Sequence, residues 1–147
     1  ANRIQHLKSM SDFNPPKNYN PDEISWVTSR IAVTDWEGGV QAQKDGHFVI
    51  CVAEEFPELG HAYIPVDPTR SRRYVAKTLD RITKLMQWVL SNSDKKVVVH
   101  CAMGMERSVL TVVWYLHTKL GLTIDEAYDM VYEARPIAVD RRHWIHS

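Results

Sequence analysis

A run of three valines that begins at Val97 ends in His100 and Cys101, and it constrains the fold more than any other segment. β-Branched residues favour strands, and a strand that is apolar on both faces is typical of a parallel sheet covered by helices. After the cysteine, residues 102–107 form a candidate loop, and Ser108 to Leu120 is largely apolar with helical spacing. The segment therefore predicts a buried central strand, a tight loop and a helix, in that order.

Apolar segments elsewhere predict the rest of the fold. The predicted strands are one or two short ones around Trp26–Val27 and Arg30–Val33, a buried one over His47–Ala53, a short edge strand over Ala62–Val66 and the central strand over Lys96–Val99. The predicted helical segments are a helix end or turn over Gln41–Gly46, an amphipathic helix over Tyr74–Ser91, the helix over Ser108–Leu120 closed by Gly121, and a last helix that follows a capping box at Thr123–Glu126 and runs to about Ala134. Strands that alternate with helices, followed by a helical C-terminal half, predict a single α/β domain with a central mixed, mainly parallel sheet flanked by helices.

The first 23 residues are polar and contain Pro15, Pro16 and Pro21. Prolines at this density interrupt regular elements, so we expect an extended arm over residues 1–23. The remaining residues, 24–147, are enough for one domain with its own core.

Composition excludes several classes of function. The chain has 18 Lys and Arg and 18 Asp and Glu, so its formal net charge is zero and no global basic field favours a nucleic-acid partner. No apolar run approaches the about 20 residues that span a bilayer, so we expect no membrane partner. Two cysteines, Cys51 and Cys101, are too few for a disulfide scaffold, and a reactive thiol suits a reducing compartment. We therefore expect a cytoplasmic location, and we expect a monomer.

The segment from Cys101 to Arg107 suits thiolate attack on a phosphate ester. The thiolate is the nucleophile, and N–H groups of a tight loop at a helix N-terminus favour the ionised sulfur. The same N–H groups make a cradle for an anion, and a guanidinium can bind two phosphate oxygens, which lysine cannot do. Cys101 is therefore the candidate nucleophile, with a buried structural cysteine as the alternative. The candidate phosphate ligands are Ala102, Met103, Gly104, Met105, Glu106 and Arg107.

These residues also follow a known signature: His100 and Cys101, then five residues, Arg107 and Ser108. At this signature the chain resembles the cysteine-dependent protein tyrosine phosphatases, and its length and flanking pattern are similar to the dual-specificity branch. The resemblance covers roughly residues 24 to 140. It implies a phosphatase that needs neither metal nor cofactor, that forms a phospho-cysteine intermediate and that acts on a phosphorylated protein or peptide. Residues 24–147 would then be the phosphatase catalytic domain.

The reaction needs a general acid to protonate the leaving oxygen. Asp67, in the loop that follows a strand end, is similar in position to the acid of the family, and Asp80, in the middle of a helix, is the alternative. Ser108 matches the hydroxyl that stabilises the departing thiolate in the family, although a helix-start hydroxyl also commonly caps a backbone N–H. We expect His100 to order the loop by hydrogen bonds and to tune the ionisation of the thiol. An ionised thiol and a protonated acid together predict a bell-shaped pH dependence.

Two loop residues depart from the family pattern. Met103 stands where many relatives have alanine, and the carboxylate of Glu106 would repel a phosphate dianion unless it points outward or pairs with a basic group. The loop contains no lysine, whereas phosphatases of inositol phospholipids often have basic residues there. The loop therefore favours a phosphorylated protein side chain as substrate.

Several further residues carry weaker expectations. Cys51 is expected to pack in the core, with a regulatory disulfide to Cys101, as some family members form, as the alternative. Trp88 and Trp114 are expected in the core because they fall on apolar helix faces. Six arginines are candidate contacts for an acidic substrate flank, although most such runs are solvated: Arg70, Arg72 and Arg73, and more weakly Arg135, Arg141 and Arg142.

Two other functions stay open at this point. A phosphatase of RNA 5′ ends or of small phosphoesters would use the same chemistry with a different pocket rim. A phosphate-recognition module would keep the cradle but would not turn substrate over.

Overall fold

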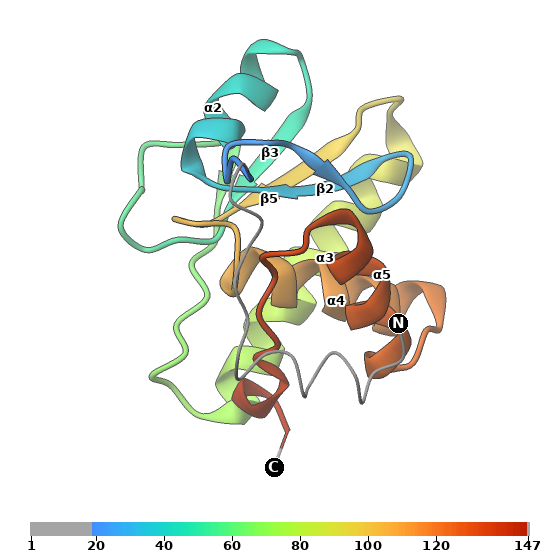
Figure 1. Ribbon diagram of the computed structural model, residues 1–147. Helices are drawn as coiled ribbons and strands as arrows, with labels where there is room; N and C mark the ends of the chain where they lie inside the picture. Colours follow the sequence, from blue (N-terminus) through green and yellow to red (C-terminus); the bar gives the residue numbers. More distant parts are fainter. Residues whose placement is uncertain (1–18, 147) are drawn as a thin grey trace.

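The valine run forms the central strand of a five-stranded sheet (Figure 1). The fold is that of a computed structural model, which describes residues 19–146. Strand β5 (Val97–His100) lies between β2 (Ile31–Thr34) and β3 (Phe48–Cys51), and it is parallel to both. The sheet order is β1-β2-β5-β3-β4, in which β4 (Ala62–Tyr63) is also parallel and β1 (Ser25–Trp26) is antiparallel to its neighbour. The predicted mixed, mainly parallel sheet is confirmed.

Alternate residues of β5 pack into two separate apolar clusters, one on each face of the sheet. Val98 belongs to a small cluster with Ala32, Ala42 and Val49. This face is covered by helix α2 (Trp36–Lys44) (Figure 1). Val97 and Val99 belong to the large cluster on the other face. Three helices pack there, α3 (Arg72–Asn92), α4 (Arg107–Leu120) and α5 (Ile124–Ala134). Every residue of β5 is buried, as a strand between two layers requires.

Helix α2 is longer than the sequence pattern predicts. It begins at Trp36, and Asp35 caps it by accepting a 2.8 Å hydrogen bond from the N–H of Gly38. Gly38 and Gly39 lower the helix propensity of this segment, which is why the pattern indicates only a helix end over 41–46. Glycine is needed at position 39, since a Cβ there would lie 2.4 Å from Cδ2 of His100. The glycine pair thus brings the helix close to the histidine that precedes Cys101.

The remaining boundaries fall close to the predicted ones. Helix α3 begins two residues early, at Arg72, because Ser71 caps it. Thr123 and Glu126 form the predicted capping box of α5, and Gly121 closes α4 in the left-handed conformation with φ 78°. The edge strand ends at Tyr63, short of Pro65, and a short 3-10 helix, η1 (Arg142–Trp144), follows α5.

The prediction that Trp88 lies in the core is wrong. Its side chain is 65% exposed, because the buried stripe of α3 runs through Leu79, Ile82 and Met86 and reaches Val89 one residue later. Adjacent helix positions point about 100° apart, so Trp88 faces away from the sheet. Trp114 is half-buried and packs against the large cluster, as predicted.

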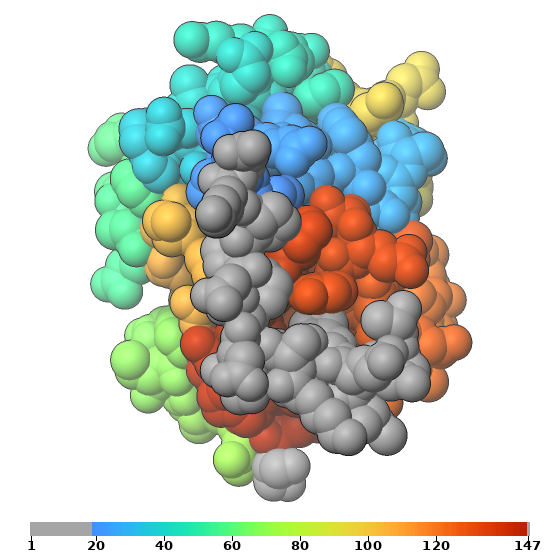
Figure 2. Space-filling view, viewed as in Figure 1, coloured from blue at the N-terminus to red at the C-terminus, as the bar shows by residue number. Residues whose placement is uncertain are grey.

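The N-terminal prediction is covered only in part. Residues 1–18 lie outside the described residues, and the boundary between an arm over 1–23 and a domain over 24–147 stays a prediction. From Tyr19 to Glu23 the chain contacts Arg135, at the end of α5. Figure 2 shows the first described residues, in blue, beside the orange-red C-terminal helices. Among residues 19–146, none of the helices has the length and apolarity needed to span a bilayer.

Candidate active site

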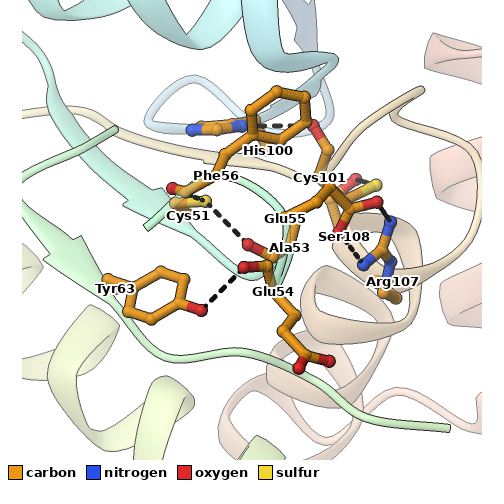
Figure 3. Close-up of polar contacts among 10 residues, drawn as sticks. All are labelled: Cys51, Ala53, Glu54, Glu55, Phe56, Tyr63, His100, Cys101, Arg107 and Ser108. Carbon is orange, nitrogen blue, oxygen red and sulfur yellow. Dashed lines mark hydrogen bonds and ion pairs between the residues drawn. The ribbon is translucent and has the colours of Figure 1, made fainter. Parts of the chain in front are cut away.

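The candidate loop leaves the carboxyl end of β5 and enters α4 at Arg107 (Figure 3). Cys101 is only 2% exposed, and its Sγ lies 3.2 Å from Oγ of Ser108, within hydrogen-bond distance. Cys101 stands at the start of the loop and Ser108 directly after its end, in the first turn of α4. The loop between β5 and α4 therefore brings the two side chains together.

Every carbonyl from Cys101 to Arg107 accepts a hydrogen bond from a donor outside the loop interior. The donors, in order, are Nδ1 of His100, the N–H of Trp36, Nη2 of Arg135, Nε of Arg135, the N–H of Val139, the N–H of Leu110 and the hydroxyl of Thr111. Because the carbonyls are held outward, the N–H groups are left for the opposite side of the loop. Within residues 19–146, no backbone N–H of residues 102–107 donates to a protein acceptor.

The first turn of α4 adds to this set of donors. Glu106 is its N-cap residue but makes no side-chain cap hydrogen bond. The N–H groups of the loop and of the helix start are therefore free to bind an anion, and the helix dipole favours a negative charge at the same place. The loop and the first turn of α4 thus form a cradle of uncharged N–H donors, and this cradle lies beside Sγ of Cys101 and the guanidinium of Arg107.

Arg135 holds much of the loop in place, and the prediction that it contacts an acidic substrate flank is wrong. Its side chain is fully buried. Nε donates to the carbonyl of Gly104 at 2.6 Å and Nη2 to that of Met103 at 3.2 Å. The other donors bind the carbonyls of Pro21 and Glu23 and Oγ of Ser25. One guanidinium thus joins the loop to the segment before β2, and burial lowers the pKa of Arg135.

Gly104 is required at the point where the loop crosses β2. Its φ is +67°, in the region that favours glycine. A Cβ there would also lie 2.5 Å from Nη2 of Arg135 and 2.6 Å from the backbone carbon of Thr34. The close approach of the loop to both neighbours explains the glycine at this position.

His100 has the geometry expected of a residue that orders the loop. It is fully buried, with Nδ1 3.2 Å from the carbonyl oxygen of Cys101. Burial lowers its pKa, so the ring is neutral near neutral pH. Among the described residues, Nε2 has no hydrogen-bond partner. The ring packs on Gly39, as described above.

Arg107 is paired with a residue that the sequence analysis does not single out. Its Nη1 and Nη2 donate to the two carboxylate oxygens of Glu55, at 2.6 and 2.9 Å (Figure 3). This bidentate pair lowers the pKa of Glu55 to about 2 and raises that of Arg107. A signal was available, since Glu54 and Glu55 follow the carboxyl end of β3, beside the end of β5. A carboxylate thus occupies the two nitrogens that suit a phosphate.

Asp67 lies in the same pocket as Arg107, as a candidate acid should. The pocket has a volume of about 540 Å³ and is lined by Glu54, Glu55, Asp67, Pro68, Thr69 and Arg107. Oδ1 of Asp67 accepts hydrogen bonds from the hydroxyl of Thr69 at 2.6 Å and from its N–H at 3.0 Å. These two bonds lower the pKa of Asp67, the hydroxyl more than the N–H. The alternative acid, Asp80, does not line the pocket, and its carboxylate accepts from Nε1 of Trp114.

Glu106 takes the second of its two predicted arrangements, because it pairs with Arg141 at 2.7 Å. The exposed fraction of Met103 is 53%.

Cys51 and Cys101 are free thiols, and Sγ of Cys51 contacts the carbonyls of Ala53 and Phe56. Burial raises the pKa of Cys51. Cys51 is buried in the large apolar cluster, as expected. The alternative, a regulatory disulfide between Cys51 and Cys101, stays a prediction.

Three of the candidate flank arginines have other contacts, whereas Arg73 is exposed. Arg70 lies over the ring of Tyr74, Arg72 donates to the carbonyl of His143, and Arg142 pairs with Asp125 and Asp140.

Within residues 19–146, no three His, Cys, Asp or Glu side chains are grouped to hold a metal ion.

Comparison with known protein families decides which family this fold and loop represent. The family described as dual specificity phosphatase, catalytic domain, matches residues 40–147. The chain belongs to the dual specificity phosphatase family. The crystal structure of human DUSP28 has the same fold, with a TM-score of 0.71 at 20% identity over 86% of this chain and 88% of that one.

Curated protein phosphatases match part of the chain. Tyrosine-protein phosphatase MSG5 of Saccharomyces cerevisiae is 32% identical over 91 residues, which are 55% of this chain and 18% of that protein. Human dual specificity protein phosphatase 16 is 30% identical over 90 residues, which are 58% of this chain and 13% of that protein. The chain thus spans less than a fifth of the length of either relative.

Replacement of Arg135 tests how far the loop depends on one guanidinium. Arg135→Met keeps most of the volume but leaves the buried carbonyls of Gly104 and Met103 without this donor, so we expect a loss of about 3 kcal/mol in the free energy of unfolding. Urea denaturation of the purified protein measures it. Arg81→Met, on the exposed face of α3, is the control and should change stability by less than about 0.5 kcal/mol. Equal effects of the two substitutions would contradict the role given to Arg135.

Proposed function

We propose that this domain is a protein tyrosine or dual-specificity phosphatase that hydrolyses phosphate monoesters through a phospho-cysteine intermediate. The observation that carries the proposal is the outward anchoring of every loop carbonyl from Cys101 to Arg107, which leaves a cradle of N–H donors next to the thiol. Membership of the dual specificity phosphatase family and the names of the curated relatives support a protein substrate.

In the first step, Sγ of Cys101 attacks phosphorus and the P–O bond to the substrate breaks. Loop N–H groups and the guanidinium of Arg107 hold the phosphoryl oxygens. Asp67 gives its proton to the leaving oxygen, so a neutral hydroxyl departs. The loop N–H groups already point to one side of the loop, whereas Arg107 exchanges Glu55 for the phosphate.

In the second step, water attacks the phospho-cysteine. Asp67, now a carboxylate, takes a proton from the water, and the S–P bond breaks to release phosphate and the thiolate. The hydroxyl of Ser108, 3.2 Å from Sγ, donates to the departing sulfur. Resting Asp67 instead accepts from Thr69, so we propose that its carboxyl turns toward the substrate before it acts.

The same reasoning extends to the cellular setting. A thiolate nucleophile needs a reducing compartment, which supports a cytoplasmic location. We further propose that residues 24–147 form the catalytic domain and that it acts as a monomer.

The nucleophile is tested first. Cys101→Ser should lower hydrolysis of an aryl phosphate by at least about a thousandfold, because a neutral hydroxyl is a poor nucleophile. Cys51→Ser, at the buried thiol outside the loop, should retain turnover. Steady-state kinetics with EDTA present in every assay measure both. Activity retained by the Cys101 variant, or lost to EDTA, would disprove the proposed mechanism.

The acid is tested through the residue that binds it. Thr69→Ala removes the hydroxyl that contributes most to lowering the pKa of Asp67, so that pKa should rise. Because a general acid works only while protonated, and kcat/KM reports the groups of the free enzyme, the alkaline limb of the kcat/KM profile should move to higher pH. Thr69→Ser keeps a hydroxyl and should preserve the wild-type limb. If both variants keep that limb, another group is the acid.

The pair between Arg107 and Glu55 predicts competition with phosphate. Glu55→Gln removes a negative charge from the guanidinium, so inhibition by inorganic phosphate should strengthen by about tenfold. Glu58→Gln removes the same charge from an exposed position of the same loop and is the control. Inhibition constants are measured with an aryl phosphate as substrate. Weaker inhibition in Glu55→Gln would mean that Glu55 positions Arg107 for phosphate instead of competing with it.

A further inference from the structure

A second pocket lies against the catalytic loop and has no part in the mechanism above. Its volume is about 340 Å³, and it is lined by Ala102 and Met103 of the loop and by residues around the start of α2. The latter include Asp22, Trp36 and Glu37. The backbone N–H of Trp36 donates to the carbonyl of Ala102, which joins the start of α2 to the loop. The pocket therefore lies against the two loop residues that directly follow Cys101.

The side chains of this pocket suit a cation. Asp22 and Glu37 are exposed, and neither carboxylate has a hydrogen-bond or ion-pair partner within residues 19–146. The Trp36 side chain is 39% exposed and stacks on Phe56, with ring centroids 5.6 Å apart. An indole attracts an ammonium or guanidinium group to its face, and carboxylates nearby add to that attraction. Exposed Met103 provides an apolar wall for the methylene stem of Lys or Arg.

The charge on the other side of the loop points the same way. Arg107 is the one basic residue among the described residues that line the two pockets, and Glu55 already neutralises it. Glu54 adds a further exposed carboxylate at the mouth of the larger pocket. A second phosphate on the substrate would therefore meet carboxylates, whereas a cationic side chain would meet opposite charge.

Three of the arginines that would favour an acidic flank make contacts within the domain. The guanidinium of Arg70 lies 4.0 Å from the centroid of Tyr74, and Arg141 pairs with Glu106 at 2.7 Å. Arg72 donates to the backbone carbonyl of His143. Neither pocket beside the loop includes any of the three.

We propose that the pocket at Trp36 and Glu37 is a subsite for a Lys or Arg side chain that flanks the phosphorylated residue of a protein substrate. This inference rests on the proposed phosphatase function and narrows its substrate class. Phosphate binds in the cradle, and the flanking cation lies between the indole and the two carboxylates. Polyanionic phosphate esters, such as inositol polyphosphates and RNA 5′-triphosphates, are disfavoured at the same rim.

Matched phosphotyrosine peptides test the subsite. They differ only in the residues on either side of the phosphotyrosine, which are Arg, Gln or Glu. We expect kcat/KM to be about tenfold higher for the Arg peptide than for the Glu peptide, and the ratio to fall at high salt. In Glu37→Lys the ratio should fall to about one or reverse, and in Trp36→Ala it should decrease several-fold. Glu58→Lys, outside both pockets, should keep the wild-type ratio. Because each ratio compares two peptides on one enzyme preparation, effects on folding or on chemistry cancel.

A binding measurement separates this inference from the proposed function. Dissociation constants of the same peptides for Cys101→Ser do not require turnover, and they should show the same order. If the wild-type protein fails to hydrolyse any peptide or aryl phosphate but the order persists in binding, the proposed function is wrong and the subsite stands. If aryl phosphate is hydrolysed and the Glu peptide or an inositol polyphosphate is preferred, the subsite is wrong and the function stands. An equal effect of Glu37→Lys and Glu58→Lys on the ratio would also overturn the subsite.

Discussion

The buried guanidinium of Arg135 is the interaction on which the catalytic loop depends. A tight loop has as many carbonyls as N–H groups, and it can present its N–H groups to an anion only if its carbonyls are bound elsewhere. Arg135 binds two of them in the middle of the loop, and the chain before β2 completes its set of acceptors. A cation that is 0% exposed thus orients the neutral N–H donors without being accessible to a substrate itself.

The sheet determines where the remaining groups lie. Because β2, β3 and β5 are parallel, their carboxyl ends meet at one edge, where ligands of such sheets commonly bind. Asp35 and Trp36 follow β2, Glu55 follows β3, and Cys101 follows β5. Each residue arrives within a few positions of its strand end, so the register of the sheet brings together groups that are far apart in sequence. Short connections then leave little freedom in how they approach the loop.

Local patterns were enough to predict the strand, the loop and the helix that carry Cys101 and Arg107, because a β-branched run and a capped apolar helix are encoded by neighbouring residues. The contacts of Arg135 and Glu55 were not predictable in this way, since each partner lies in another element. Helix α2 was underestimated for a related reason: its two glycines are unfavourable for a helix and are explained only by the approach of Thr34 and His100. Trp88 shows the converse error, in which an apolar residue one position from the buried stripe points outward.

The charge distribution of the site follows from how the loop is held. Neutral N–H groups aimed at one point can bind a phosphate without a cluster of lysines, so the surrounding rim can be acidic without abolishing anion binding. Glu55 pairs with Arg107 and Thr69 binds Asp67, so both charged groups of the proposed reaction have partners in the resting domain. A phosphate that displaces Glu55 releases a carboxylate at the pocket mouth, next to Glu54. The released carboxylate keeps the rim of that pocket acidic while the phosphate is bound. The ion pair that offsets the charge of Arg107 at rest therefore leaves an acidic rim when phosphate is bound.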